Sequence, residues 1–555
     1  MRFLACRPKQ KTLKMNFRAF LFGCMLVFQA VPFSARAIQN DCHTIVIPPG
    51  LGIGPGADVT SFNPLFVTSL YNQEAIWMMF EQLVWVNRNH DIDWTRSLAS
   101  SISIGDNGKT FDITLRPWVW SDGVPVTSAD ILYTYKLIQS YGQNYSGYGG
   151  GGVPMLIQSM TAPDAEHVRI VLKHAVNPQW FILNGISQFT PLPQHIWGKY
   201  TTNQIWDEQS NPAFFSVVDG PLKIRKLAIG QYAEFVPNPL YPGAKMHFER
   251  FFMKFQNNEG EELQAVQSDD IDMGNVPFDL YSKAAGMPGT RLVTMPPSYS
   301  WNELVPNLLN KSTGFFKDIR IRQALADAIN QKEIIRIAFH GHGIETYNPV
   351  PPVPANFLSP SAKQGDYPVG YNPQKARMLL KAAGFTPGKD GILQKDGQRL
   401  EFTLEIPAGQ DLRIEIAELI QQDLKAVGID MKVQQVEFNE LLTAMVSMPQ
   451  SWQAILIAED LSPYPSGEYL FKTGGYYNNN GYSDKTMDQL IDESTNLPGM
   501  QALFAYQDYA SAQQPVIFLP EEEYSVLARE NVHGVRDFMN PLGMWAPEKL
   551  FCTAH

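Results

Sequence analysis

The sequence predicts an α/β protein with two or more domains or lobes, on three observations. The chain has 555 residues, which is more than one simple hydrophobic core normally holds. Hydrophobic residues make up 44% of it and charged residues 18%, which excludes an intrinsically disordered chain. In its second half, strand, helix and strand signals follow one another at the spacing of a βαβ unit, which favours parallel strands.

The strand–helix–strand pattern begins in the stretch GILQKDGQRLEFTLEIP, residues 391–407. Its Asp396-Gly397 pair predicts a hairpin turn, and apolar residues alternate after that turn. Apolar residues then recur on one helical face at Ile416, Ile420, Leu424 and Val427. Gly428 ends the helical pattern and strand alternation resumes, so the segment predicts a helix between two strands.

The first half of the chain contains more strand and turn signals. The stretch SISIGDNGKTFDITLRP, residues 101–117, alternates on both sides of an Asp-Asn-Gly turn and predicts a hairpin. The stretch WSDGVPVTSADI, residues 120–131, adds an Asp-Gly turn and a capping-box pattern formed by Thr127 and Asp130. We therefore expect a strand to end and a helix to begin there. A further helix is expected after Asn372, an N-cap residue followed by proline.

Residues 1–37 have the pattern of a cleavable signal peptide. A basic start precedes an apolar run from Ala19 to Val31, and Ala35-Arg36-Ala37 matches an A-x-A cleavage site. The apolar run is too short to span a membrane comfortably. Leu21–Cys24 is similar to a lipoprotein cleavage box, so a lipid anchor at Cys24 is the less favoured alternative. The segment predicts an exported protein.

The charge of the exported chain argues against nucleic acid as a partner. Residues 1–37 contain seven Lys and Arg and no Asp or Glu, so their removal changes the formal net charge from −11 to −18. Binding to nucleic acid needs a basic surface that can neutralise phosphates. The sequence therefore predicts a protein that does not bind nucleic acid.

Two cysteines remain after residues 1–37 are removed, Cys42 and Cys552, near opposite ends of the chain. In an oxidising compartment they could form a disulfide, and the alternative is two unrelated thiols. No metal-binding motif competes for them.

The sequence carries no strong catalytic motif. It has no Gly-x-Ser-x-Gly nucleophile elbow and no His-Glu-x-x-His helix. The carboxylates of NEGEE (258–262) and SDDID (268–272) could form an acid/base pair, and His340 and His342 could contact a metal. Solvated surface is the more common role of such clusters. We therefore expect a protein that is not an enzyme and has no cofactor.

A series of stretches, in order, resembles the extracellular solute-binding proteins of ABC importers, the peptide/nickel class called family 5. The resemblance covers nearly the whole chain after residue 37. The matching segments are FEQLVWVNRNHDI (80–92), LRPWVWSDGVPVTSADILYTYKLI (115–138), PLPQHIW (191–197), VPNPLYPG (236–243), FFKDIRIRQALADAI (315–329), GYNPQKARMLLKAAGF (370–385) and NNNGYSDKTMDQLID (478–492).

The resemblance implies a type II-like periplasmic-binding-protein fold in its three-subdomain large form. Two lobes, joined by two crossing segments, close a central cleft over the ligand. The implied bounds are 38–295 for the first lobe with an extra subdomain at about 66–185, 296–520 for the second lobe, and 521–555 for a C-terminal return to the first. Both Cys42 and Cys552 would then lie in the first lobe, which favours their pairing.

The resemblance also implies where a peptide would be held. Peptide-binding members pair the ligand's α-amino group with the acidic residue of a Trp-x-x-Asp-Tyr segment. The matching stretch here is ILIAEDLSPYP, residues 455–465, which assigns that role to Asp460 with Glu459 adjacent. Ile457 and Leu461 stand where those members have tryptophan and tyrosine, so Asp460 as the cap of a turn is the alternative.

Three further residues are candidates for the cleft. Lys311 lies near the place where some members hold a cation for the ligand's carboxylate. Trp301 and Tyr464 could wall the cleft through aromatic contacts, or could pack in the core.

The expected function is therefore binding without chemistry. The resemblance implies a monomeric periplasmic protein that captures a small solute, most simply a peptide, and delivers it to an ABC permease in the inner membrane. Two alternatives remain: the same fold binding a metal chelate or an oligosaccharide, and a receptor role without transport.

Overall fold

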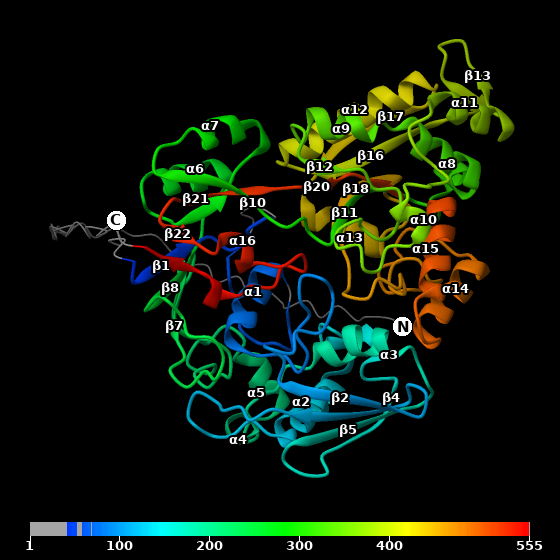
Figure 1. Cartoon of the computed structure of the whole chain (residues 1–555). Coiled ribbons are helices and arrows are strands. Elements are labelled where there is room, and N and C mark those ends of the chain that lie inside the picture. Colours follow the sequence, from blue (N-terminus) through cyan, green and yellow to red (C-terminus); the bar gives the residue numbers. More distant parts are fainter. Residues whose placement is uncertain (1–41, 53–57, 68, 554–555) are drawn as a thin grey trace, which may run out of the picture. The chain divides into compact units, whose positions relative to one another are not determined.

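The computed structural model describes residues 42–52, 58–67 and 69–553 (Figure 1). The expected signal peptide at 1–37 and the candidate lipid site Cys24 lie outside the described residues. Sheets and helices alternate along the chain, so the α/β class is confirmed.

A four-stranded antiparallel sheet contains the hairpin predicted for residues 101–117. In spatial order its strands are β2 (Ala99–Gly105), β3 (Thr110–Leu115), β5 (His167–Leu172) and β4 (Ile157–Thr161). Helix α2 (Ser128–Tyr141) begins directly after Thr127, as the capping pattern predicts. The Asp130 carboxylate accepts the Thr127 backbone N–H at 2.9 Å, which satisfies a donor at the start of the helix.

The two tryptophans beside this cap are packed in the protein interior. Trp118 is 5% exposed and Trp120 is fully buried, and the Trp118 indole donates to the Asp219 carbonyl at 2.9 Å. The turn and cap are therefore a scaffold element of the fold.

Two further sheets bring the beginning, middle and end of the chain together. One has the order β1 (Thr44–Ile47), β8 (Arg250–Lys254), β7 (Tyr232–Pro237) and β6 (Leu222–Ala228), with β1 parallel to β8. The other has the order β10 (Thr290–Thr294), β21 (Ser525–Arg529) and β9 (Met273–Asn275).

A five-stranded mixed sheet forms the centre of the second half of the chain. Its order is β17 (Asp430–Val436), β16 (Glu401–Pro407), β18 (Ala454–Asp460), β11 (Ser300–Pro306) and β19 (Ile517–Leu519). Strand β16, helix α12 (Asp411–Ala426) and strand β17 form the predicted βαβ unit, with the two strands parallel.

The hairpin expected around Asp396-Gly397 is shorter than the sequence suggests. Only β14 (Leu393–Lys395) and β15 (Gln398–Arg399) pair across this turn, together with β13 (Thr386–Pro387). The alternating residues after Arg399 belong to β16, which joins the central sheet, because its partners come from later in the chain.

The two faces of the central sheet belong to different hydrophobic clusters. Leu304, Leu404 and Leu456 pack with apolar residues of four helices on one face. Those helices are α8 (Ile319–Ala328), α9 (Gln331–Ile337), α11 (Pro373–Ala382) and α12. Val305 and Ile455 belong to the larger cluster on the other face, which includes residues of α13 (Phe438–Ser447).

The chain passes twice between the β10–β21 sheet and the central sheet. Residues 295–299 connect β10 to β11, and residues 520–524 lie between β19 and β21. Strand β11 is tied to the second passage by Asn302, whose side-chain amide donates to the Pro520 carbonyl at 2.8 Å. The lobe boundaries at 295/296 and 520/521 remain predictions.

The remaining elements are short strands and helices. The strands are β12 (Gly343–Ile344), β20 (Glu521–Glu522), β22 (Val532–His533) and β23 (Phe551–Cys552). The helices are α1 (Leu70–Met79), α3 (Pro178–Trp180), α4 (Gln194–Trp197), α5 (Thr202–Asp207), α6 (Glu259–Gln267), α7 (Tyr281–Ala285), α10 (Pro360–Lys363), α14 (Lys485–Asn496), α15 (Gln501–Gln513) and α16 (Val535–Phe538).

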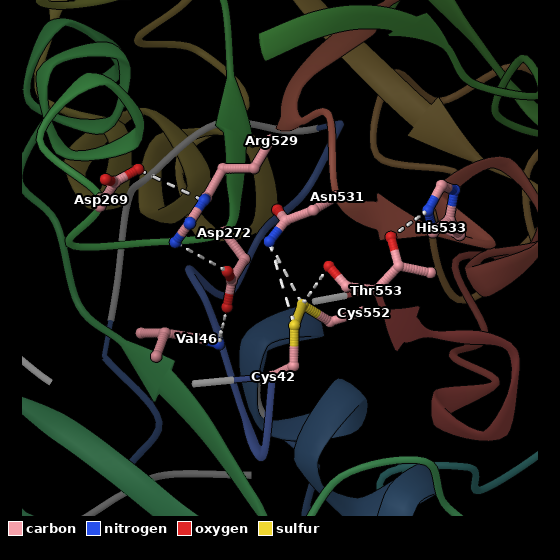
Figure 2. The surroundings of a disulfide bond; sticks show 9 residues. All are labelled: Cys42, Val46, Asp269, Asp272, Arg529, Asn531, His533, Cys552 and Thr553. Atoms are coloured by element: carbon pink, nitrogen blue, oxygen red, sulfur yellow. Dashed lines mark hydrogen bonds and ion pairs between the residues drawn. A yellow bond between two sulfur atoms is a disulfide. The ribbon is translucent and has the colours of Figure 1, made fainter. Parts of the chain in front are cut away.

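A disulfide joins Cys42, just before β1, to Cys552 in β23 (Figure 2). The Asn531 amide lies against it and donates to the Cys552 Sγ at 3.3 Å. Nearby, the Asp272 carboxylate accepts the Val46 N–H at 2.7 Å and faces Arg529. The bond therefore closes nearly the whole described chain into one loop.

We predict that replacing both cysteines, by Cys42→Ser and Cys552→Ser together, lowers the midpoint of urea unfolding. The bond closes a loop of 510 residues, which in the chain-entropy model constrains the unfolded state by roughly 5–6 kcal/mol, an upper figure. A reductant should lower the wild-type midpoint to that of the double variant and leave the variant unchanged. A wild-type midpoint that ignores the reductant would contradict the prediction.

Candidate functional site

The candidate site lies where β11 and β18 pair beside the passages between sheets (Figure 1). The two strands are antiparallel, with Ser300 opposite Asp460 and Trp301 opposite Glu459. Glu303 lies opposite Ile457, one diagonal step from Glu459. The start of one strand and the end of the other thus bring three carboxylates together.

Alternation along the strands distributes these carboxylates over the two faces of the sheet. Glu459 projects to the same face as its partner Trp301 and as Glu303, whereas Asp460 projects to the other face with Ser300. The Trp301 indole N–H donates to the Glu303 carboxylate at 2.9 Å and so fixes its orientation.

The end of β18 has an open edge. On the side away from β11, β18 pairs with β16 only through Ala454 and Ile455. Within the described part of the chain, no strand pairs with residues 456–460 on that side. The backbone there can accept an additional strand.

Asp460 occupies a recessed position. The residue is exposed, yet burial among surrounding atoms raises the pKa of its carboxyl. The carboxyl is thus partly enclosed by protein and still accessible. Solvent or a ligand can therefore reach this carboxyl, which is what a cleft requires.

The neighbouring carboxyls are also hard to ionise. Burial raises the pKa of the Glu459 carboxyl well above its usual value, and the charges of Glu303 and Asp460 raise it further. Burial raises the pKa of Glu303 to about 7, although the Trp301 hydrogen bond partly opposes the shift. No described Lys, Arg or His forms an ion pair with any of the three. The site is therefore an uncompensated acidic cluster, in which a cation would bind favourably.

Two tyrosines lie close to Glu459, and one arginine binds Asn302, the residue between Trp301 and Glu303 in β11. Burial and then the charge of Glu459 raise the pKa of Tyr477, and the rings of Tyr476 and Tyr477 meet edge to face with centroids 4.9 Å apart. The Arg413 guanidinium is engaged on the other face of the sheet, where it donates to the Asn302 side-chain oxygen.

The structure buries both aromatic residues that were candidates for the cleft wall. Trp301 is 1% exposed and packs edge to face on Phe518, and Tyr464 has no exposed surface. The Tyr464 hydroxyl accepts from the Asn177 amide at 3.0 Å. The core-packing alternative thus describes these rings better than an open aromatic wall does, and Trp301 acts on the site through Glu303.

The basic candidates lie elsewhere. Lys311 is exposed at the start of a 3₁₀ segment, Lys311–Lys317, and its backbone N–H donates to Gln450. His342 stacks on Phe278 with ring centroids 6.3 Å apart. The described residues contain no group of three or more His, Cys, Asp or Glu side chains placed to hold a metal ion.

Sequence analysis missed Glu303 and Tyr477. A signal for Glu303 was present, because a charged residue interrupts the apolar stretch SWNELVP that forms β11. Nothing local connects Tyr477 to Glu459, since only the fold brings the two segments together.

The family comparison agrees with this geometry. A model described as "Bacterial extracellular solute-binding proteins, family 5 Middle" matches residues 94–495. The chain belongs to the family 5 extracellular solute-binding proteins. It is therefore a solute-binding protein, as the resemblance implied.

Individual relatives cover most of the chain. The oligopeptide-binding protein AppA of Bacillus subtilis is 27% identical over 502 residues, 88% of each chain. Its structure in complex with a nonapeptide superposes with a TM-score of 0.73 at 24% identity, over 92% of this chain and 99% of AppA. NikZ of Campylobacter jejuni, in complex with Ni(L-His), gives a TM-score of 0.76 at 22% identity, over 93% of this chain and 100% of NikZ.

These likenesses confirm the predicted two-lobe solute-binding fold. Family 5 proteins are extracellular. Among the helices of the described residues, none is long and apolar enough to cross a membrane.

We predict that Glu303→Gln changes stability in a pH-dependent way. The unfolded carboxyl ionises near pH 4.5 and the folded one near pH 7, so the folded state holds more protons between these values. Wild-type stability relative to the variant should therefore fall as pH rises from about 4.5 to 7, by on the order of 1–3 kcal/mol. Urea unfolding of both proteins at pH 4.5, 6 and 8 measures this difference, in which the titrating groups that do not interact with Glu303 cancel; Glu459, which does interact with it, titrates with it as a pair. A difference that is constant with pH would overturn the assignment.

Proposed function

We propose that this protein captures peptides in the periplasm and delivers them to an ABC permease in the inner membrane. Asp460 pairs with the ligand's α-amino group, and the two lobes close over the bound peptide. The ligand stabilises the closed form through contacts that exist only there.

The observation that carries this proposal is the recessed acidic cluster. Asp460 keeps accessible surface, burial raises the pKa of its carboxyl, and no described cation pairs with it. An ammonium group would supply the missing charge and form a charge-assisted hydrogen bond. A free peptide N-terminus is the small, abundant group with this chemistry.

The open edge of β18 supports a peptide in particular. An extended ligand along residues 456–460 would satisfy their free backbone groups by adding a strand. This contact uses only the main-chain groups of the ligand, so it suits peptides of varied sequence. A sugar or a metal chelate cannot complete a strand ladder.

The ligands bound to relatives include peptides, which agree with this proposal, and a nickel chelate, which is the alternative. AppA binds a nonapeptide, and DppA of Helicobacter pylori binds the peptide STSA. The DppA structure superposes with a TM-score of 0.73 at 19% identity, over 92% of this chain and 98% of DppA. NikZ binds Ni(L-His). A nickel chelate is thus the alternative ligand class to be tested.

We predict that Asp460→Asn weakens peptide binding by roughly 10- to 100-fold, the equivalent of about 1.5–3 kcal/mol for a charge-assisted bond. Isothermal titration of the ligand-stripped protein lacking residues 1–37 with a tetra-alanine peptide measures it. The N-acetylated peptide, which lacks the ammonium, should bind wild type as weakly as the free peptide binds the variant.

The matched control is Glu418→Gln, which removes one carboxylate from an exposed position of α12 and should leave affinity unchanged. Nickel–histidine and oligosaccharides are titrated in parallel. Binding of one of these with no binding of any peptide would keep the fold and reject the peptide proposal. Equal affinity for the free and the acetylated peptide would reject the role of Asp460.

A further inference from the structure

We propose that Glu459, supported by Glu303, selects ligands with a second positive charge: a lysine or arginine side chain in one of the first two residues of the peptide. This inference rests on the proposed function, and it assigns a substrate class to the same cleft.

The first argument is the charge of the cluster. An α-amino group on Asp460 neutralises one carboxylate, and Glu459 and Glu303 remain without a described cationic partner. Arg413 is engaged on the face of the sheet opposite Glu459 and Glu303, where it donates to Asn302. Ionisation of Glu459 in this environment requires a counter-charge from outside the chain.

The second argument is the geometry of the open strand edge. Residues opposite each other in a β-ladder project to the same face, and successive residues project to opposite faces. Asp460 and Glu459 therefore face opposite sides of any strand added to β18. With the ligand's N-terminus at Asp460, one of its first two side chains must lie on the Glu459 face, whichever direction the peptide runs.

The third argument is the aromatic surface beside Glu459. Tyr476 is 77% exposed and Tyr477 is 52% exposed, although aromatic rings are costly to leave in water. Tyr477 lies close enough to Glu459 for the carboxylate charge to act on its hydroxyl. Tyrosine faces next to a carboxylate suit an ammonium or guanidinium group, which gains cation–π contact as well as the ion pair.

Glu303 has a supporting role in this arrangement. It is 5% exposed, the Trp301 indole fixes its orientation, and it lies on the same face as Glu459, one diagonal step away, so its negative charge adds to that of Glu459. Glu459 is half-buried and is the carboxyl that a ligand can reach.

The test compares two peptide pairs in isothermal titration: Lys-Ala-Ala-Ala with its norleucine counterpart, and Ala-Lys-Ala-Ala with its norleucine counterpart. Norleucine keeps the aliphatic chain and removes the charge. At low salt we expect one lysine peptide to bind at least about tenfold more tightly than its norleucine partner. Glu459→Gln should abolish that preference, so that the variant binds the lysine peptide and its norleucine partner with equal affinity.

Controls separate this inference from the proposed function. Glu418→Gln should keep the full lysine preference, and Glu303→Gln should reduce it. Equal binding of lysine and norleucine peptides by wild type would overturn the selection for charge and leave peptide capture standing. Binding of no peptide at all would overturn both. Because the wild-type comparison needs no variant, a folding defect in Glu459→Gln would not rescue the inference.

Discussion

The pairing of β11 with β18 is the constraint on which the site depends. These two strands come from distant parts of the sequence and form the middle of the central sheet, next to both passages between sheets. Their register decides that Trp301 lies opposite Glu459 and that Glu303 lies one diagonal step away. A shift by one residue would move each of these side chains to the other face of the sheet. The hydrophobic clusters on both faces oppose such a shift, because it would move Leu304 or Leu456 out of the cluster in which it packs and put a polar side chain in its place. The core therefore sets the position of the carboxylates.

Local signals predicted much of the fold, and pairing between distant segments was the part they could not supply. The Thr127–Asp130 cap is satisfied within four residues, so its sequence pattern was sufficient. The Asp396-Gly397 turn was identified too, but the strand after it pairs with later strands, and no local pattern encodes that choice. The βαβ unit was predictable because one helix separates its two strands.

In the candidate site, too, local sequence identified some residues but not how distant segments pair. Asp460 and Glu459 were found through a short motif resemblance, which a single stretch can carry. Their relation to Glu303 depends on strand register, which the sequence does not display. The two candidate aromatic residues illustrate the converse problem, since composition cannot separate a cleft wall from a core residue. Trp301 is 1% exposed because it packs in the larger hydrophobic cluster, on the face of the sheet that also carries Glu303 and Glu459.

An uncompensated acidic cluster has a consequence for how binding and closure are coupled. Closing a cleft over unpaired carboxylates removes water from charged groups, and without a counter-charge those groups must take up protons or resist burial. A cationic ligand changes this balance, because its charge stabilises the ionised carboxylates most where water is absent. The closed form is thus disfavoured while the cleft is empty and favoured when a cation is present. On this argument the raised pKa of the Glu459 carboxyl and the proposed preference for a charged ligand have one origin. Burying these carboxylates costs free energy, and only a cationic ligand offsets that cost. On this argument, the closed form that delivers the ligand is favoured only when a ligand of the right charge is bound.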